Sequence, residues 1–176
     1  MITIRTMKQE DKAQKDYIHS ITWLETYAIQ VQNQELSIQK IESYNQKNQT
    51  SIENHVVAEV NGRIVGFVSF GQNRDGIEET GEIYSLHVLR SHKNQDIEVM
   101  LLQEALSRLS HYKQVITWVL ITDINKVAWF QQHGFTNNGS MRMLYFFEGH
   151  RTTEMLLSYY DGIDDEIINA YSRRRD

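Results

Sequence analysis

The sequence predicts a mixed α/β fold in which a central sheet is covered by helices. Three observations predict it: two β-rich runs meet at a tight turn, a strand runs directly into a helix, and a nearly continuous apolar strand precedes a second helix. A strand meander followed by a strand-helix-strand crossover produces a mixed sheet. A chain of 176 residues suits one such domain. We expect it to span residues 1–160, with residues 161–176 as a C-terminal helix or tail.

The N-terminal part of the chain predicts a strand, two helices and a hairpin. Residues 2–6 alternate apolar and polar side chains as a half-buried strand does, and residues 15–29 carry apolar side chains at helical spacing. Residues 30–54 are rich in Gln and Asn, and we expect a second helix and a loop there. Within residues 55–71, Asn61-Gly62 supplies the positive φ angles that a tight type I′ hairpin turn requires.

The C-terminal part alternates strands and helices. The residue patterns predict, in order, a strand over residues 81–89, a helix from Gln95, a buried strand over 115–122, a short helix that ends at Gly134, and two closing strands over 141–147 and 152–159. Glu148-Gly149-His150 joins the two closing strands.

Composition and charge argue against several classes of protein. The formal net charge is -5, which disfavours a nucleic-acid binder, and we interpret the basic run Arg173–Arg175 as a solvated tail. No apolar run is long enough for a membrane span and the N-terminus lacks a signal peptide, so we expect a cytoplasmic protein. The chain has no cysteine, and His111, His133 and His150 lack metal-ligand spacing. We predict no metal.

Three stretches, in their order along the chain, resemble the GNAT superfamily of acetyl-CoA-dependent N-acetyltransferases. They are HVVAEVNGRIVGFVSFG, EIYSLHVLRSHKNQDIEVMLLQEAL and DINKVAWFQQHGF. The resemblance implies the GNAT fold, with three layers and a central, mostly antiparallel mixed sheet that carries helices on both faces. It also implies acetyl-CoA as co-substrate, with direct transfer of the acetyl group to a primary amine of a small molecule or protein.

The resemblance locates the cofactor site at the end of a strand and the start of a helix. The family's loop Arg/Gln-x-x-Gly-x-Gly/Ala wraps the CoA pyrophosphate with backbone N–H groups and the positive end of the helix dipole. Here both glycine positions hold carboxylates, Asp96 and Glu98. Either the loop still binds the cofactor, aided by Arg90, His92 and Lys93, or these two carboxylates are ordinary residues of a helix start. The implied cofactor-binding residues are Leu86, Val88, His92, Lys93, Asn94, Gln95, Asp96, Ile97, Glu98, Val99, Asp123, Asn125 and Phe130.

The resemblance also assigns candidate catalytic residues on the preceding strand. Glu82 matches the family's strand-borne carboxylate and is the candidate general base, the alternative being a plain exposed glutamate. Tyr84 and His87 are further catalytic candidates, or packing residues. A backbone N–H near His87 or Val88 would stabilise the oxyanion, because the family's strand bulges there.

Two further sites depend on the alignment with the family. Trp23 and Tyr27 would line the acceptor site, although their spacing equally fits helix packing. Phe130 stands where the family has a tyrosine that faces the thioester sulfur, and a phenylalanine donates no proton. Shifting the alignment by two residues places Asn125 and Ala128 on the pattern instead.

Two other functions remain open beside the N-acetyltransferase. A catalytically impaired GNAT-like domain would bind a ligand or partner without transferring an acetyl group. An unrelated mixed α/β binding domain would share the pattern by accident. The sequence is also compatible with a homodimer, and it does not identify the acceptor.

Overall fold

The computed structural model describes residues 1–27, 51–93, 95–146 and 150–160. The helix predicted within residues 30–54, the link Glu148-Gly149, the predicted C-terminal helix or tail and the basic run Arg173–Arg175 lie outside these ranges, although residues 51–54 are described. The chain forms two compact units. The first unit comprises Met1–Gln72 and Glu82–Leu109, and the second begins with Asn73–Gly81 and resumes at Ser110.

The first unit contains four strands that follow one another in the sheet as β1-β2-β3-β4. Their bounds are β1 Ile2–Thr6, β2 His55–Val60, β3 Arg63–Gln72 and β4 Thr80–Val88, whose first two residues belong to the second unit. The helices are α1 Lys12–Tyr27 and α3 Ile97–Arg108, with short 3-10 turns η1 Gln9–Asp11, η2 Ile52–Asn54 and η3 Arg90–His92. Asn61 and Gly62 have φ angles of 51° and 78°. This confirms the predicted tight turn between β2 and β3.

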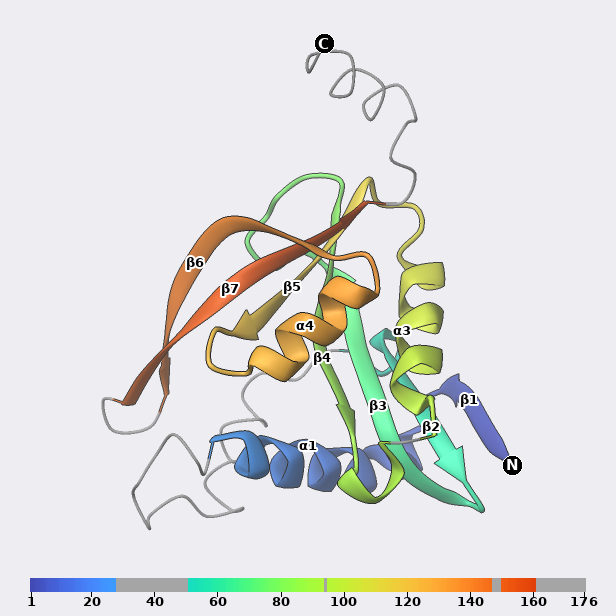
Figure 1. The fold of residues 1–176 in the computed structure, drawn as a ribbon. Helices are drawn as coiled ribbons and strands as arrows, with labels where there is room; N and C mark the ends of the chain where they lie inside the picture. The colour runs from blue at the N-terminus through green and yellow to red at the C-terminus, as the bar shows by residue number, and fades with distance from the viewer. Residues whose placement is uncertain (28–50, 94, 147–149, 161–176) are drawn as a thin grey trace. The chain divides into compact units, whose positions relative to one another are not determined.

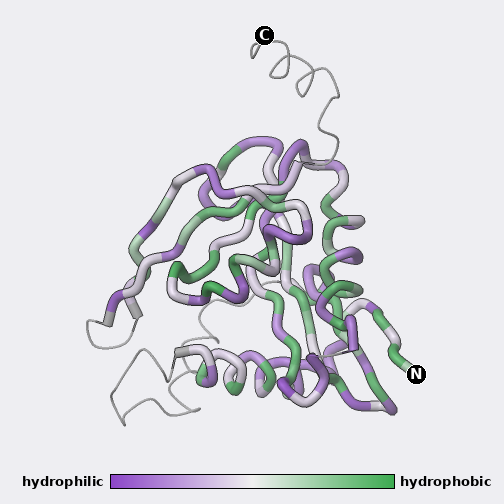
Figure 2. The backbone as a smooth tube through the Cα atoms, in the orientation of Figure 1, coloured by the Kyte–Doolittle hydropathy of each residue, from purple (hydrophilic) through white to green (hydrophobic). Residues whose placement is uncertain are grey.

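Helices α1 and α3 pack on opposite faces of the strands of the first unit (Figure 1). Ile18 of α1 belongs to a core cluster with Val57 and Phe67, which are paired across β2 and β3. A Cβ at Gly66, the residue of β3 directly before Phe67, would lie 3.3 Å from Leu101 of α3. Because successive strand residues point to opposite faces, the two helices cover the two sides of this sheet. Figure 2 shows the hydrophobic stretches of the strands and of α3 that this packing buries.

The second unit contains three strands in the order β5-β7-β6 and one helix. The bounds are β5 Gln114–Leu120, α4 Ile124–Gln132, β6 Thr136–Phe146 and β7 His150–Tyr160. As predicted, α4 is stopped by Gly134, which has a φ angle of 90°. The alternation of helices and strands in the two units confirms the predicted α/β class.

Strand β6 begins five residues earlier than predicted, at Thr136. The segment from Asn137 to Gly139 has the composition of a turn, and Gly139 does have a positive φ angle of 85°. Pairing with β7 nevertheless continues from Met141 back to Asn137 through an irregularity in the register. Tertiary pairing therefore overrides the local turn signal.

Candidate active site

Strand β4 carries one extra residue relative to its neighbour β3. The N–H of Leu89 donates to the carbonyl of Val65, and the N–H of Asn73 donates to the carbonyl of Thr80. In a regular antiparallel ladder the two residue numbers of every bonded pair have the same sum. Here the β4 side between these two bonds is one residue longer than the β3 side, which defines a β-bulge in β4.

Side-chain contacts place this bulge between Tyr84 and His87. A Cβ at Gly71 would lie 2.6 Å from the Tyr84 hydroxyl oxygen, and the His87 ring centroid lies 5.5 Å from that of Phe67. Phe67 and Gly71 share one face of β3, because they are an even number of residues apart. Tyr84 and His87 therefore lie on the same face of β4, although a regular strand would place them on opposite faces.

The bulge brings all three predicted catalytic side chains to one face, the face that α1 covers. Glu82 shares this face with Tyr84 because it lies two positions before it. Glu82 is only 1% exposed, so the alternative of a plain exposed glutamate is wrong. The Tyr84 hydroxyl donates a hydrogen bond of 2.6 Å to the carbonyl of Gln72.

His87 faces the side chains of helix α1. Its Nδ1 lies 2.9 Å from the hydroxyl oxygen of Thr22, and its ring centroid lies 5.0 Å from that of His19. His87 is partly exposed, unlike Glu82. Tyr84 is also partly exposed, but its hydroxyl is already used as a donor to Gln72, so His87 is the candidate on this face that could accept a proton.

The predicted cofactor loop leads into the N-terminus of α3, and its backbone has the shape that a glycine would give. Asp96 has φ 56° and ψ 12°, in the left-handed region where glycine pays no steric cost. The exposed Asp96 side chain makes no capping hydrogen bond to the helix. Asp96 therefore stands at the N-cap position of α3 without capping it through its side chain, and the alternative of a helix-start carboxylate favoured by the helix dipole stays open. The first N–H groups of α3 have no partners within the helix and remain as potential anion-binding donors.

The other residues of this loop divide into exposed and buried positions. Lys93 and Gln95 are exposed, while His92, Glu98 and Val99 are partly exposed. Glu98 lies in the first turn of α3, where the helix dipole favours an acidic side chain. Ile97, Leu86 and Val88 are buried core residues, so only their backbone groups are available to a cofactor. Asn94 lies outside the described residues.

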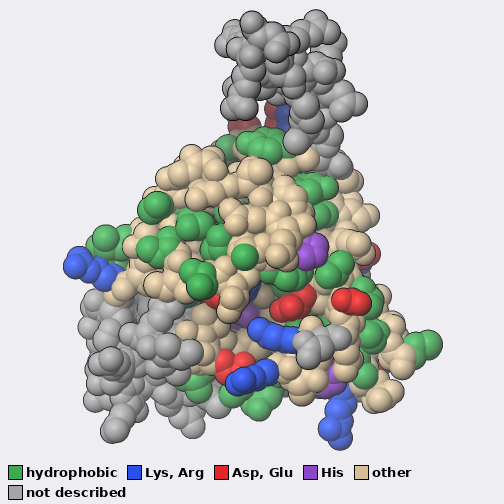
Figure 3. All heavy atoms as spheres, in the orientation of Figure 1, with side chains coloured by type: hydrophobic (Ala, Val, Ile, Leu, Met, Phe, Trp, Pro, Cys, Tyr) green, Lys and Arg blue, Asp and Glu red, His purple; other side chains and the backbone are tan. Residues whose placement is uncertain are grey.

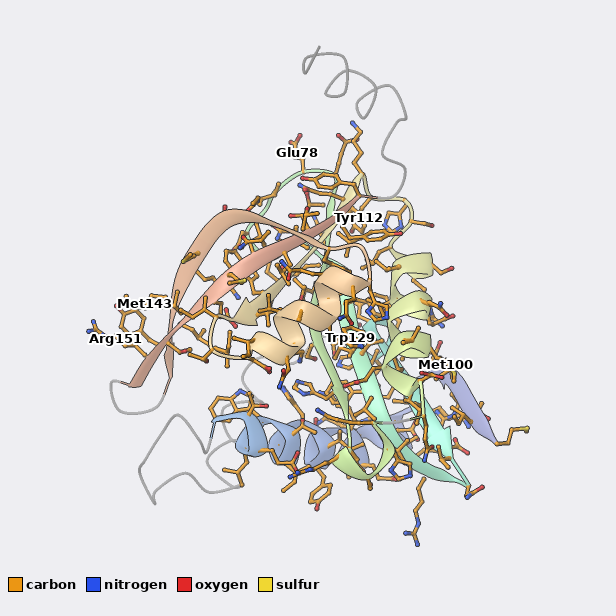
Figure 4. All side chains as sticks on the ribbon, viewed as in Figure 1. Glu78, Met100, Tyr112, Trp129, Met143 and Arg151 are labelled. Atoms are coloured by element: carbon orange, nitrogen blue, oxygen red, sulfur yellow. The ribbon has the colours of Figure 1, made fainter. Side chains whose placement is uncertain are left out.

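The residues predicted on α4 take structural positions in the second unit. The Asp123 carboxylate accepts a hydrogen bond of 3.1 Å from the N–H of Lys126 and so caps α4. Phe130 is 1% exposed and packs edge-on against Phe135. Asn125 is exposed on the first turn of the helix. Trp129, labelled in Figure 4, packs against the ring of His133, the residue that follows the end of α4.

Sequence and structure comparisons identify the family. A family model described as an acetyltransferase (GNAT) domain matches residues 24–158. The chain belongs to the GNAT acetyltransferase family. A search of curated protein sequences found no match.

Solved structures share the fold with this GNAT domain at low sequence identity. The PaiA N-acetyltransferase from Thermoplasma acidophilum, in complex with coenzyme A, is 16% identical with a TM-score of 0.68, covering 92% of this chain and 99% of that one. A ribosomal-protein-alanine N-acetyltransferase from Brucella melitensis is 19% identical with a TM-score of 0.65, covering 90% and 99%. An N-acetyltransferase from Staphylococcus aureus Mu50 is 19% identical with a TM-score of 0.61, covering 91% and 98%. These likenesses confirm the predicted fold.

The acceptor-site residues predicted from the GNAT pattern lie on α1. Trp23 is 9% exposed, which agrees with a packing role on its helix. Tyr27 is the last residue of α1, and its side chain lies outside the described set. The acceptor role of both residues stays a prediction.

Further features of the GNAT chain are its surface charges, the apolar character of its helices and the grouping of its ionisable side chains. Acidic, basic and histidine side chains are mixed on the face drawn in Figure 3. Within the described ranges, no helix has both the length and the apolar character needed to span a membrane. Among the same residues, no three His, Asp or Glu side chains come together as a metal site would require.

Sequence reasoning missed Thr22 and the exact place of the bulge. Thr22 belongs to an ordinary amphipathic helix pattern, and nothing in its sequence neighbours marks it as a partner of His87. The burial of Thr22, which Lys15 and Ser20 of α1 share, is seen only in the structure.

Proposed function

We propose that this protein is an N-acetyltransferase that uses acetyl-CoA and acetylates a primary amine of a small molecule or protein. The observation that supports this most directly is the combination of a bulged β4 with a left-handed residue at the head of α3. The bulge leaves backbone groups outside the ladder, and Asp96 has a left-handed backbone of the kind that favours glycine.

The residues at the head of α3 fit a diphosphate through their backbone. The N–H groups of Ile97, Glu98 and Val99 would hold the phosphate oxygens, and the exposed side chains of Arg90 and Lys93 add positive charge. The Asp96 carboxylate opposes this binding. Acetyl-CoA, when bound, supplies an acetyl group activated as a thioester.

The β4 side chains would manage the proton that the amine must lose. An ammonium group is not a nucleophile, so a base must take its proton first. His87 is our candidate for this base because it is partly exposed and because histidine is the side chain most often used as a general base. Because Glu82 is buried, it would not contact the amine directly. A backbone N–H at the bulge, near His87 or Val88, would donate to the oxyanion.

A catalytically impaired ligand-binding domain is the second candidate function. Two observations favour it: the exposed Asp96 carboxylate lies at the head of α3, where the diphosphate would bind, and Phe130 is a buried core residue without a hydroxyl to protonate a departing thiolate. The Asp96 carboxylate would lower the affinity for the cofactor, and the missing hydroxyl at Phe130 would lower the rate. Neither removes the backbone N–H donors at the head of α3.

Two measurements test the proposal. Calorimetric titration of acetyl-CoA into the protein should give saturable binding in the micromolar range. Release of free CoA with a panel of small primary amines and short peptides with free N-termini should be followed by a thiol reagent, and the absence of cysteine from the chain removes any protein background. Peptides belong in the panel because one structure of the same fold is named for a ribosomal-protein alanine.

A His87→Gln variant is the matched control for turnover. It should bind acetyl-CoA as the wild type does and lose roughly 10²-fold or more in kcat. No binding of acetyl-CoA at millimolar concentration would refute the proposal. Binding without turnover on any amine would favour the ligand-binding domain.

A further inference from the structure

We propose that Thr22 is a positioning residue that fixes the tautomer of His87, so that Nε2 is the nitrogen that accepts the proton. This inference rests on the proposed function for its catalytic meaning, but the tautomer itself can be measured without any substrate. Thr22 is 6% exposed on α1, and His87 lies on the β4 face that this helix covers.

The hydroxyl of Thr22 has one hydrogen and three neighbours that could receive it, the most distant being the carbonyl oxygen of His19, at 3.2 Å from the hydroxyl oxygen of Thr22. Its oxygen lies 2.7 Å from the carbonyl oxygen of Ile18, one turn earlier on the helix, and 2.9 Å from Nδ1 of His87. A carbonyl only accepts, so the contact with Ile18 exists only if Thr22 donates its hydrogen there. The distance to Ile18 is the usual one for O–H···O, and the distance to His87 is the usual one for N–H···O.

The remaining contact then determines the protonation of the imidazole ring. Because the Thr22 hydrogen points to Ile18, the Thr22 oxygen must accept from Nδ1–H of His87. A neutral histidine with its hydrogen on Nδ1 has its lone pair on Nε2. In the reverse arrangement Thr22 would donate to Nδ1, the lone pair would be on Nδ1, and Nε2–H could not take a proton from an amine.

The test uses two substitutions of Thr22 and one control on the same helix. Thr22→Val keeps the shape and removes the hydroxyl, and Thr22→Ser restores it. Thr26→Val is the matched control, because the Thr26 hydroxyl also donates to the carbonyl one turn earlier, that of Thr22, at 3.0 Å. Thermal unfolding should show that all three variants fold.

The tautomer is read from nitrogen and carbon chemical shifts of labelled histidine side chains, with His87→Gln used to assign the His87 signals. In the wild type at neutral pH we expect the hydrogen on Nδ1. In Thr22→Val, Nδ1–H would face a methyl group and lose its acceptor, so we expect the hydrogen to move to Nε2. Thr22→Ser and Thr26→Val should resemble the wild type.

The effect of each Thr22 substitution on kcat should parallel its effect on the tautomer of His87. Thr22→Val should lower kcat roughly 10- to 100-fold, which is part of what a positioned base contributes, with the KM for acetyl-CoA unchanged. Thr22→Ser should recover most of that loss, which a purely structural defect would not predict.

Two results would overturn the inference: a hydrogen on Nε2 of His87 in the wild type, or an unchanged His87 tautomer in Thr22→Val. A wild type with the expected tautomer but no acetyl transfer would instead refute the proposed function and with it the catalytic role of Thr22, while the hydrogen-bond assignment would stand.

Discussion

Replacing Asp96 tests whether the head of α3 binds a diphosphate. Asp96 is the residue that we align with the first glycine of the family's loop; it has a left-handed backbone and an exposed carboxylate that makes no capping hydrogen bond. Asp96→Asn removes the charge and keeps a side chain that tolerates the left-handed region. Asp96→Gly removes the charge and the Cβ together. Both variants should bind CoA more tightly than the wild type.

The size of the effect follows from the exposure of this side chain. Two unit charges about 4 Å apart repel by about 1 kcal/mol in water and by about 4 kcal/mol near a protein surface. Because Asp96 is exposed, the lower value applies, and it corresponds to about a fivefold change in Kd. The folded state should be little affected by Asp96→Gly. Relief of about 1 kcal/mol of left-handed strain is offset by the greater entropy of glycine in the unfolded chain.

Calorimetric titration with CoA at low and at high ionic strength measures this effect. The gain in affinity should shrink as salt rises, because exposed charges are screened within about 10 Å at 0.1 M salt. Glu104→Gln is the matched control. It removes one carboxylate from the same helix, two turns away, where Glu104 pairs with Arg108 at 2.8 Å. Unchanged or weaker CoA binding by Asp96→Asn would refute the placement of the diphosphate beside this residue.

Three further predictions concern the first unit. Asp11 accepts hydrogen bonds from Arg5 at 2.6 and 3.0 Å, which lower its pKa, so Asp11→Asn should reduce the free energy of unfolding by about 1.5–3 kcal/mol. That contribution is fully present above the ordinary pKa of 3.8 and is lost as pH falls through the lowered value. The free energies of unfolding of the wild type and of Asp11→Asn should therefore differ most above about pH 4 and converge at lower pH, with exposed Glu10→Gln as control. Burial, and next the charge of Lys15, lower the pKa of His55 from 6.5; the free energy of unfolding should therefore fall as pH drops below about 6.5, and urea titrations of His55→Gln should show a flatter dependence. A Cβ at Gly66 would lie 2.8 Å from Val88 Cγ2 and 3.0 Å from the carbonyl of His87, so Gly66→Ala should destabilise the fold by about 1–3 kcal/mol, and an unchanged melting temperature would contradict the close packing at the bulge.

Local patterns in the sequence were sufficient to predict most of the described helices and strands. Asn61-Gly62 defines its hairpin because few other dipeptides reach two positive φ angles, and Gly134 ends α4 for the same reason. The period of the apolar residues distinguished α3 from the strands on either side of it. The order of these elements also indicated the family, which the match over residues 24–158 confirms.

Tertiary structure alone decided which candidate side chains share a face. Period-two alternation places Tyr84 and His87 on opposite sides of β4, and only the pairing with β3 shows the extra residue that turns His87 toward α1. The burial of Glu82 and the contact of Thr22 with His87 depend on residues distant in the chain. The left-handed backbone of Asp96 and the lack of a capping hydrogen bond from its side chain are likewise seen only in the structure.

The sequence by itself therefore determined most of the described secondary structure and the family, because these depend on interactions between near neighbours, and it predicted a chain segment for the cofactor. The tertiary structure decided that His87 faces Thr22 and shares a face of β4 with Glu82, because a single inserted residue in one strand reverses the direction of every side chain beyond it.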